Sequence, residues 1–107
     1  MLQVFQPTRI LSSSTTGDLL DGIDLAIERG VTIVLIDLSH VLFMDSSGLG
    51  ALVIAYKRMR AINGRFALCS LNGQARMLLE QSGMESVFEI YGSVADFHQS
   101  EAAKKPG

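Results

Sequence analysis

The run VTIVLID, residues 31–37, constrains the fold more than any other part of the sequence. It is continuous, apolar and rich in β-branched side chains, without the polar alternation of a strand that faces water on one side. Such a strand is buried on both faces, as happens where helices cover a parallel sheet. The run therefore predicts a central strand in an α/β domain.

Strand-like and helix-like segments alternate along the rest of the chain. Apolar residues at helical spacing and helix-stop signals predict helices over 16–29, 46–62 and 74–81, and a last one after Ser93. Extended segments are predicted at 2–5, 9–11, 65–71 and 86–91. We expect a small α/β sandwich: a mixed, mostly parallel sheet of four or five strands with about four helices, and allow an antiparallel N-terminal edge strand.

Composition fits one folded domain. The chain has 107 residues, of which 48% are hydrophobic and 19% charged, as is usual for a single globular unit. We place the domain at residues 1–100 and expect a flexible tail at 101–107. A formal net charge of -2 argues against direct binding of nucleic acid. One cysteine, no leader-like start and no apolar run near 20 residues predict a cytoplasmic location without membrane insertion.

The segment DSSGLG, residues 45–50, concentrates small polar residues where the helix at 46–62 should begin. The plainest interpretation is helix initiation, with Asp45 as the N-cap. The same geometry favours an anion, because unpaired N–H groups and the positive end of the helix dipole lie beside Ser46 and Ser47. A phosphate there would be tolerated by the fold, but its charge beside Asp45 would repel a docked partner. The spacing alone leaves both interpretations open.

A longer stretch resembles a known family. The string IVLIDLSHVLFMDSSGLG is followed by a helix that stops at Asn63-Gly64, a strand that carries Cys69, and the element SGMESVF. In this order the segments are similar to the STAS domain of bacterial anti-sigma factor antagonists. The similarity covers roughly residues 9–98 and implies a binding protein that is not an enzyme and has no cofactor.

The resemblance also implies partners and site residues. When unphosphorylated, such proteins bind an anti-sigma factor that is often a serine kinase with a histidine-kinase-like ATPase fold. Phosphorylation of the first serine after the aspartate, which is Ser46 here, releases them, and a PP2C-type phosphatase restores binding. The implied partner-binding residues are Asp45, Ser47, Gly48, Leu49, Ser12, Ser13 and Met44.

This chain departs from the family pattern at Ser12, where many members have an acid. Less negative charge near Ser46 leaves the choice of kinase, and phosphorylation itself, open. A STAS scaffold or signalling adaptor that does not act on a sigma factor, and that binds nucleotides weakly, therefore remains an alternative. The short N-terminal start also leaves weak self-association through the sheet edge open.

Other patterns carry less functional meaning. His40 and Ser46 resemble a nucleophile with its base, but no G-x-S-x-G elbow is present. Gly48 and Gly50 match part of a dinucleotide fingerprint whose third small position holds Val53. One cysteine and two distant histidines give no metal-ligand spacing. We assign the remaining residues of note to a solvated helix face or to core packing: Lys57, Arg58 and Arg60 to the first, Cys69 to the second.

Overall fold

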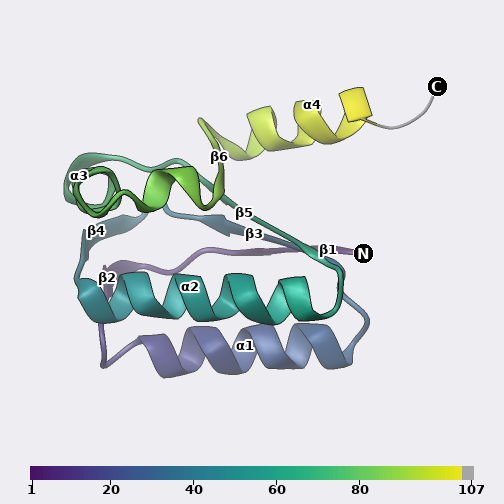
Figure 1. The fold of residues 1–107 in the computed structure, drawn as a ribbon, viewed down its shortest axis with the longest axis horizontal. Coiled ribbons are helices and arrows are strands. Elements are labelled where there is room, and N and C mark those ends of the chain that lie inside the picture. Colours follow the sequence, from purple (N-terminus) through teal and green to yellow (C-terminus); the bar gives the residue numbers. More distant parts are fainter. Residues whose placement is uncertain (105–107) are drawn as a thin grey trace.

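A parallel four-stranded sheet forms the middle of the molecule in the computed structural model, which describes residues 1–104 (Figure 1). Its strands lie in the order β1 (Leu2–Phe5), β3 (Ile33–Asp37), β5 (Arg65–Cys69) and β6 (Glu89–Tyr91). The α/β class and the central position of β3 are confirmed. The antiparallel edge strand is wrong, because β1 pairs with β3 in parallel. In the sequence, a strand at Arg9–Leu11 and a helix at Thr16–Glu28 connect β1 to β3. This connection returns the chain to the end of the sheet at which β1 began, so β3 runs in the same direction as β1.

Helices cover the two faces of this sheet unequally (Figure 1). Their bounds are α1 Thr16–Glu28, α2 Ser46–Ala61, α3 Gly73–Ser82 and α4 Val94–Lys104, with a short 3-10 turn at Met84–Ser86. α1 and α2 lie side by side against one face and bury the main core, in which Ile23, Ile36 and Leu68 are completely enclosed. On the other face, Phe97 of α4 packs against a smaller cluster.

A second sheet has two parallel strands, β2 (Arg9–Leu11) and β4 (Val41–Met44). β4 was not predicted, because its four residues show no alternation of buried and exposed positions: the outer two are buried and the inner two are exposed. The main sheet has four strands, as predicted, and the small sheet brings the strands within residues 1–104 to six. Since Leu11 pairs with Met44, both strands end at the same edge.

Most predicted helix ends are confirmed. Asn63 (φ 57°) and Gly83 (φ 73°) adopt the left-handed conformation after α2 and α3, and the Ser93 hydroxyl accepts the Asp96 N–H at 3.0 Å at the start of α4. Thr15 stands at the N-cap position of α1, but its side chain forms no capping hydrogen bond. Its hydroxyl instead donates to the Ile10 carbonyl oxygen at 2.9 Å, so it joins α1 to the small sheet.

The C-terminal boundary also differs from the prediction. α4 continues through Lys104, so residues 101–104 are helical rather than a flexible tail. Arg65 explains part of this extension, because its guanidinium forms an ion pair with Glu101 at 2.7 Å. Residues 105–107 of the predicted tail lie outside the described residues. Within residues 1–104, no helix is long and apolar enough to cross a membrane. Weak self-association through the β1 edge stays a prediction.

Candidate functional site

The start of α2 lies at the edge where both strands of the small sheet end (Figure 1). The Asp45 N–H donates to the Leu11 carbonyl oxygen at 3.3 Å, which ties the turn before α2 to the end of β2. Ser12 and Ser13 follow Leu11 directly. The structure therefore brings these two serines to the same edge as Asp45 and Ser46.

Asp45 caps α2. Its Oδ1 accepts the Gly48 N–H at 3.0 Å, and its carbonyl oxygen accepts the Leu49 N–H at 3.0 Å. The N–H groups of Ser46 and Ser47 belong to the first turn, where the helix itself offers no acceptor. With the helix dipole, they favour an added anion by about 0.3–1 kcal/mol at an exposed position. The Ser46 side chain is exposed and makes no hydrogen bond within residues 1–104, so it is accessible for modification.

Two predicted partner-binding residues are buried instead. Met44 is 0% exposed and belongs to the main core. Gly48 is also buried, and a Cβ atom there would collide with the Leu11 carbonyl oxygen. The absence of a side chain at Gly48 therefore lets α2 pack against β2. Leu49 is half-buried against the core. The polar residues of the predicted site are the accessible ones: Asp45, Ser46, Ser47, Ser12 and Ser13.

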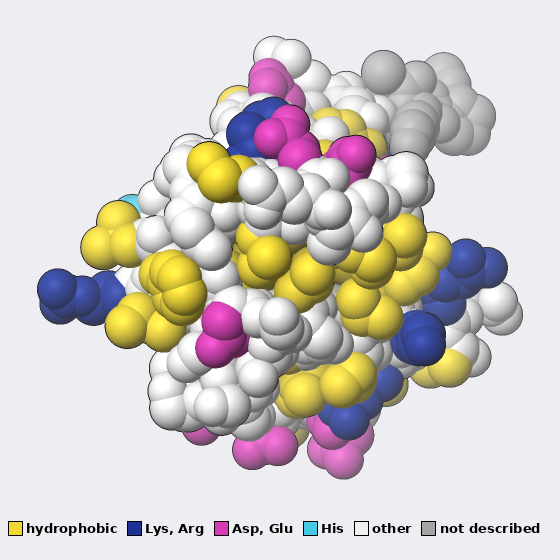
Figure 2. All heavy atoms as spheres, turned by 60° about the vertical axis from the view of Figure 1, so that its left-hand side comes forward, with side chains coloured by type: hydrophobic (Ala, Val, Ile, Leu, Met, Phe, Trp, Pro, Cys, Tyr) yellow, Lys and Arg dark blue, Asp and Glu magenta, His cyan; other side chains and the backbone are white. Residues whose placement is uncertain are grey.

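Sequence reasoning missed an exposed apolar patch beside this turn, formed by Ile10, Leu42 and Phe43. Their side chains are 48%, 72% and 45% exposed. Ile10 pairs with Phe43 across the small sheet, so the two side chains are neighbours. Figure 2 turns this end of the molecule forward and shows hydrophobic side chains gathered on its surface. Recognising VLFM as a strand would have been the signal that some of its side chains face outward.

Gln74 of α3 was also missed, and it fixes the strand that leads into the site. Its Oε1 accepts the Met44 N–H at 2.8 Å, and its Nε2 donates to the Met44 carbonyl oxygen at 2.8 Å. These are the bonds that a further strand would form with this part of β4. A glutamine near the start of a helix has no distinctive pattern, so the sequence carried no signal for this role.

Asp37, at the end of β3, holds the turn that leads to β4. Burial alone would raise its pKa, but this effect is outweighed by hydrogen bonds to its carboxylate, so the pKa lies below the ordinary value. The donors are the Ser39 N–H at 3.0 Å, the Gln6 amide at 2.9 Å and the hydroxyls of Ser39 and Ser70. Cys69 on the adjacent strand is 0% exposed, which confirms core packing, and burial raises the pKa of its thiol.

The geometry does not support a hydrolase. His40 precedes β4 and Ser46 follows it, so at least about 13 Å of extended strand separates the two. Within the described residues, no three His, Cys, Asp or Glu side chains gather as metal ligands. On α2, Arg58 pairs with Asp24 at 3.0 Å and Arg60 donates to the Tyr56 hydroxyl at 2.9 Å. Arg58 and Arg60 thus have partners within the chain, and both lie on a solvated face of α2, as predicted.

Known proteins share both sequence and fold with this chain. A family model described as the STAS domain matches residues 4–97. The anti-sigma F factor antagonist of Paenibacillus polymyxa is 36% identical over 58 residues, which are 54% of this chain and 50% of that relative. The anti-sigma-B factor antagonist of Listeria monocytogenes is 34% identical over 64 residues, 60% of this chain and 55% of its own. The chain thus spans about half the length of these relatives.

Solved structures agree at the level of the fold. A Thermotoga maritima protein has a TM-score of 0.85 at 22% identity, covering 92% of this chain and 86% of its own. The Bacillus cell fate determinant SpoIIAA in its phosphorylated form has a TM-score of 0.72 at 22% identity, covering 92% and 89%. Because the family model covers residues 4–97, from within β1 to the first turn of α4, this chain belongs to the STAS domain family.

Proposed function

We propose that this chain is an anti-sigma factor antagonist that binds its partner with the apolar patch and the N-terminal end of α2, and is released when Ser46 is phosphorylated. The observation that carries the proposal is an exposed hydroxyl in the first turn of a helix, next to exposed apolar side chains. The names of the relatives from Paenibacillus polymyxa and Listeria monocytogenes support the same class of protein.

The apolar patch accounts for attraction to the partner. Clustered large apolar side chains on a protein surface are typical of protein interfaces. The patch adjoins the turn that holds Ser46, because Leu42 and Phe43 shortly precede Asp45 in the chain. Thr15 engages the Ile10 carbonyl oxygen and Gln74 engages the Met44 backbone. The patch therefore favours packing by side chains over addition of a strand from the partner.

The phosphate accounts for release. A phosphoserine adds about -1.5 to -2 charge at pH 7. Within the chain this charge meets the positive end of α2, which favours it by about 0.3–1 kcal/mol. A partner docked over the same helix end would have to desolvate the phosphate beside the Asp45 carboxylate, at a cost of several kcal/mol. Phosphorylation of Ser46 would thus change binding and not folding.

The partner that fits is an anti-sigma factor that is also a serine kinase with a histidine-kinase-like ATPase fold, met in the cytoplasm. Such a kinase transfers the γ-phosphoryl group of its own ATP to the Ser46 oxygen, so the antagonist needs no catalytic residue or cofactor. A PP2C-type phosphatase would then hydrolyse the phosphate and restore binding. Ser12 stands near Ser46, at a position where many family members have an acid. The ATP phosphates of the kinase would therefore be repelled by one negative charge fewer.

Phosphoryl transfer tests the switch. The protein would be incubated with ATP and each anti-sigma factor kinase of the source genome, and any mass gain mapped to a residue. We expect a phosphate on Ser46 alone, no gain in Ser46→Ala, and retained kinase binding by that variant. A phosphate on another serine would place the switch elsewhere. No transfer by any kinase would contradict the switch and favour a scaffold or adaptor role.

Two leucine variants test the docking surface. Leu42→Ser removes the most exposed side chain of the apolar patch, whereas Leu25→Ser makes the same change on α1, where the side chain is 44% exposed. We expect Leu42→Ser to weaken kinase binding about tenfold or more, as removal of an interface anchor does. Leu25→Ser should bind as the unmodified protein does. Equal affinities of the two variants would exclude the patch from the interface.

A further inference from the structure

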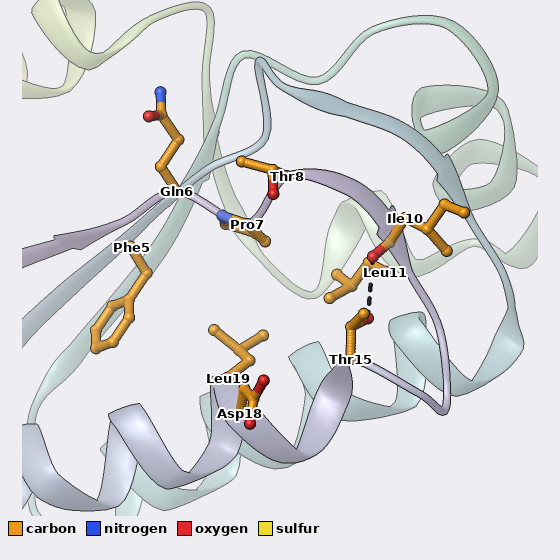
Figure 3. Close-up of a pocket in the computed structure, with 9 residues that line it drawn as sticks. All are labelled: Phe5, Gln6, Pro7, Thr8, Ile10, Leu11, Thr15, Asp18 and Leu19. Carbon is orange, nitrogen blue, oxygen red and sulfur yellow. Dashed lines mark hydrogen bonds between the residues drawn. The ribbon is translucent and has the colours of Figure 1, made fainter.

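A groove of about 310 Å³ lies between the β1–β2 connection and the first turns of α1 (Figure 3). Its apolar wall is formed by Phe5, Leu11 and Leu19. Figure 3 shows these side chains directed toward one space, with Asp18 at its margin. The volume is at the lower end of the range of small-molecule sites, which is about 300–1,000 Å³. It fits a ligand with a single or fused ring.

The apolar wall depends on a glycine of α1. A Cβ atom on Gly22 would lie 2.9 Å from Cε1 of the Phe5 ring, closer than such atoms approach. Without that Cβ, the ring can rest against the helix and form one side of the groove. Leu11 and Leu19 are 1% and 8% exposed, so they are held in place by the core beneath. The groove is therefore a preformed surface and not a gap between flexible side chains.

The charge of the groove selects the kind of ligand. Asp18 is the one charged residue among those that line it. Its carboxylate and the Thr8 hydroxyl, also in the lining, make no hydrogen bond or ion pair within residues 1–104. The rest of α1 adds acids and no Lys or Arg between Thr16 and Glu28. Asp18 lies in the first turn of α1, where the positive end of the helix offsets part of its charge. An apolar wall with an unpaired carboxylate at its margin still gives a modest preference for a cation that carries an apolar body.

We propose that this groove binds a small organic amine, with a flat apolar body against Phe5, Leu11 and Leu19 and its ammonium group beside Asp18. Leu11 links the groove to the start of α2, because its carbonyl oxygen accepts the Asp45 N–H at 3.3 Å and faces the Cα of Gly48. Through this contact, a bound amine would change the environment of the turn that holds Ser46. The inference stands without any kinase or phosphate.

Titration of the 15N-labelled protein with tryptamine, followed by NMR, tests the site. We expect saturable amide shifts in residues 5–11, apart from Pro7, and in residues 15–19, with a dissociation constant of about 1 mM for a ligand of this size, and a smaller shift at Asp45. Indole-3-propionate has the same ring with the opposite charge and should bind about tenfold more weakly or not at all. Shifts that stay linear with concentration, or equal affinity for both compounds, would overturn the proposal.

A matched pair of variants separates the groove from the general acidity of α1. Asp18→Asn and Asp21→Asn remove the same charge from the same helix, and both residues are exposed, but only Asp18 lines the groove. Asp18→Asn should weaken tryptamine about three- to tenfold, whereas Asp21→Asn should leave its affinity within about twofold. Equal weakening, or the same shifts with spermidine, would mean non-specific attraction to the helix. Neither result would bear on phosphorylation of Ser46.

Discussion

The four-stranded sheet and the two-stranded sheet are both parallel and rich in apolar side chains, but only the two-stranded sheet leaves a group of them exposed. In the four-stranded sheet, Leu35 and Leu68 face opposite sides and both are 0% exposed, because helices cover each face. In the two-stranded sheet, Leu42 is 72% exposed. The small sheet therefore divides its apolar residues: Leu11, Val41 and Met44 are buried in the main core, whereas Ile10, Leu42 and Phe43 form the apolar patch beside Ser46. The apolar content of a strand alone therefore does not separate buried core from exposed surface.

The same leucine-to-alanine change in each sheet tests this contrast most strongly. Leu68→Ala should lower the free energy of unfolding by about 2–5 kcal/mol, through lost burial and the cavity left behind. Leu42→Ala should change it by no more than about 0.5 kcal/mol, as for most surface positions. Urea unfolding of the two variants measures both. Similar losses would mean that the Leu42 side chain also belongs to the stabilising core.

The joint between the two sheets gives the next largest effect. Gly48→Ala forces a methyl group onto the Leu11 carbonyl oxygen, and we expect a loss of about 1–3 kcal/mol, as for overpacked sites. Gly50→Ala is the matched control on the same helix, because nothing lies within 4 Å of its added Cβ. Alanine should there stabilise the helix by roughly 0.5–1 kcal/mol. Changes of the same sign in thermal unfolding would show that α2 does not press on β2.

Removing the helix cap should have a smaller effect. Asp45→Ala deletes the acceptor of the Gly48 N–H and should lower the free energy of unfolding by about 1 kcal/mol. Asp45→Asn keeps a capping oxygen and should stay within a few tenths of a kcal/mol of the unmodified protein. Chemical denaturation at pH 7 compares the two. An equal loss in both would mean that the charge of Asp45, and not its hydrogen bond, stabilises the start of α2.

The smallest effect should be a pH dependence from the four-stranded sheet. The pKa of Asp37 is lower in the folded chain than its ordinary value of 3.8. The carboxylate therefore contributes stability above that value, and the contribution is lost as the pH falls through the folded pKa. Asp37→Asn should show a shallower decline of unfolding free energy in this acidic range. Parallel pH profiles for the two proteins would contradict the role given to its hydrogen bonds.

The sequence predicts the four-stranded sheet better than the two-stranded sheet. The run at residues 31–37 predicted β3, because a strand buried on both faces needs an unbroken apolar sequence. Asn63 and Gly83 marked helix ends, because few residues adopt their left-handed conformation. β4 was not predicted, because two of its four residues face solvent and the strand is too short to show a repeating pattern of apolar and polar residues.

Within the candidate site, local chemistry was predictable and long-range contact was not. Asp45 was identified as a cap from residue type and position alone, and the structure confirms it. Met44 and Gly48 were named as partner-binding residues from the family resemblance, yet contacts with segments 30 or more residues away bury them. The bond from Gln74 to Met44 joins positions 30 apart in sequence, and no local pattern encodes such a pairing.

The affinity of the kinase partner for two forms of this chain, one unmodified and one carrying phosphoserine at position 46, tests the proposed switch most directly. Calorimetry would measure binding, and urea unfolding of the same samples would measure stability. We predict that phosphorylation weakens binding by about 100-fold or more, while the free energy of unfolding changes by no more than about 1 kcal/mol. Equal affinities of the two forms, or unfolding of the phosphorylated chain, would contradict a switch that acts on binding alone.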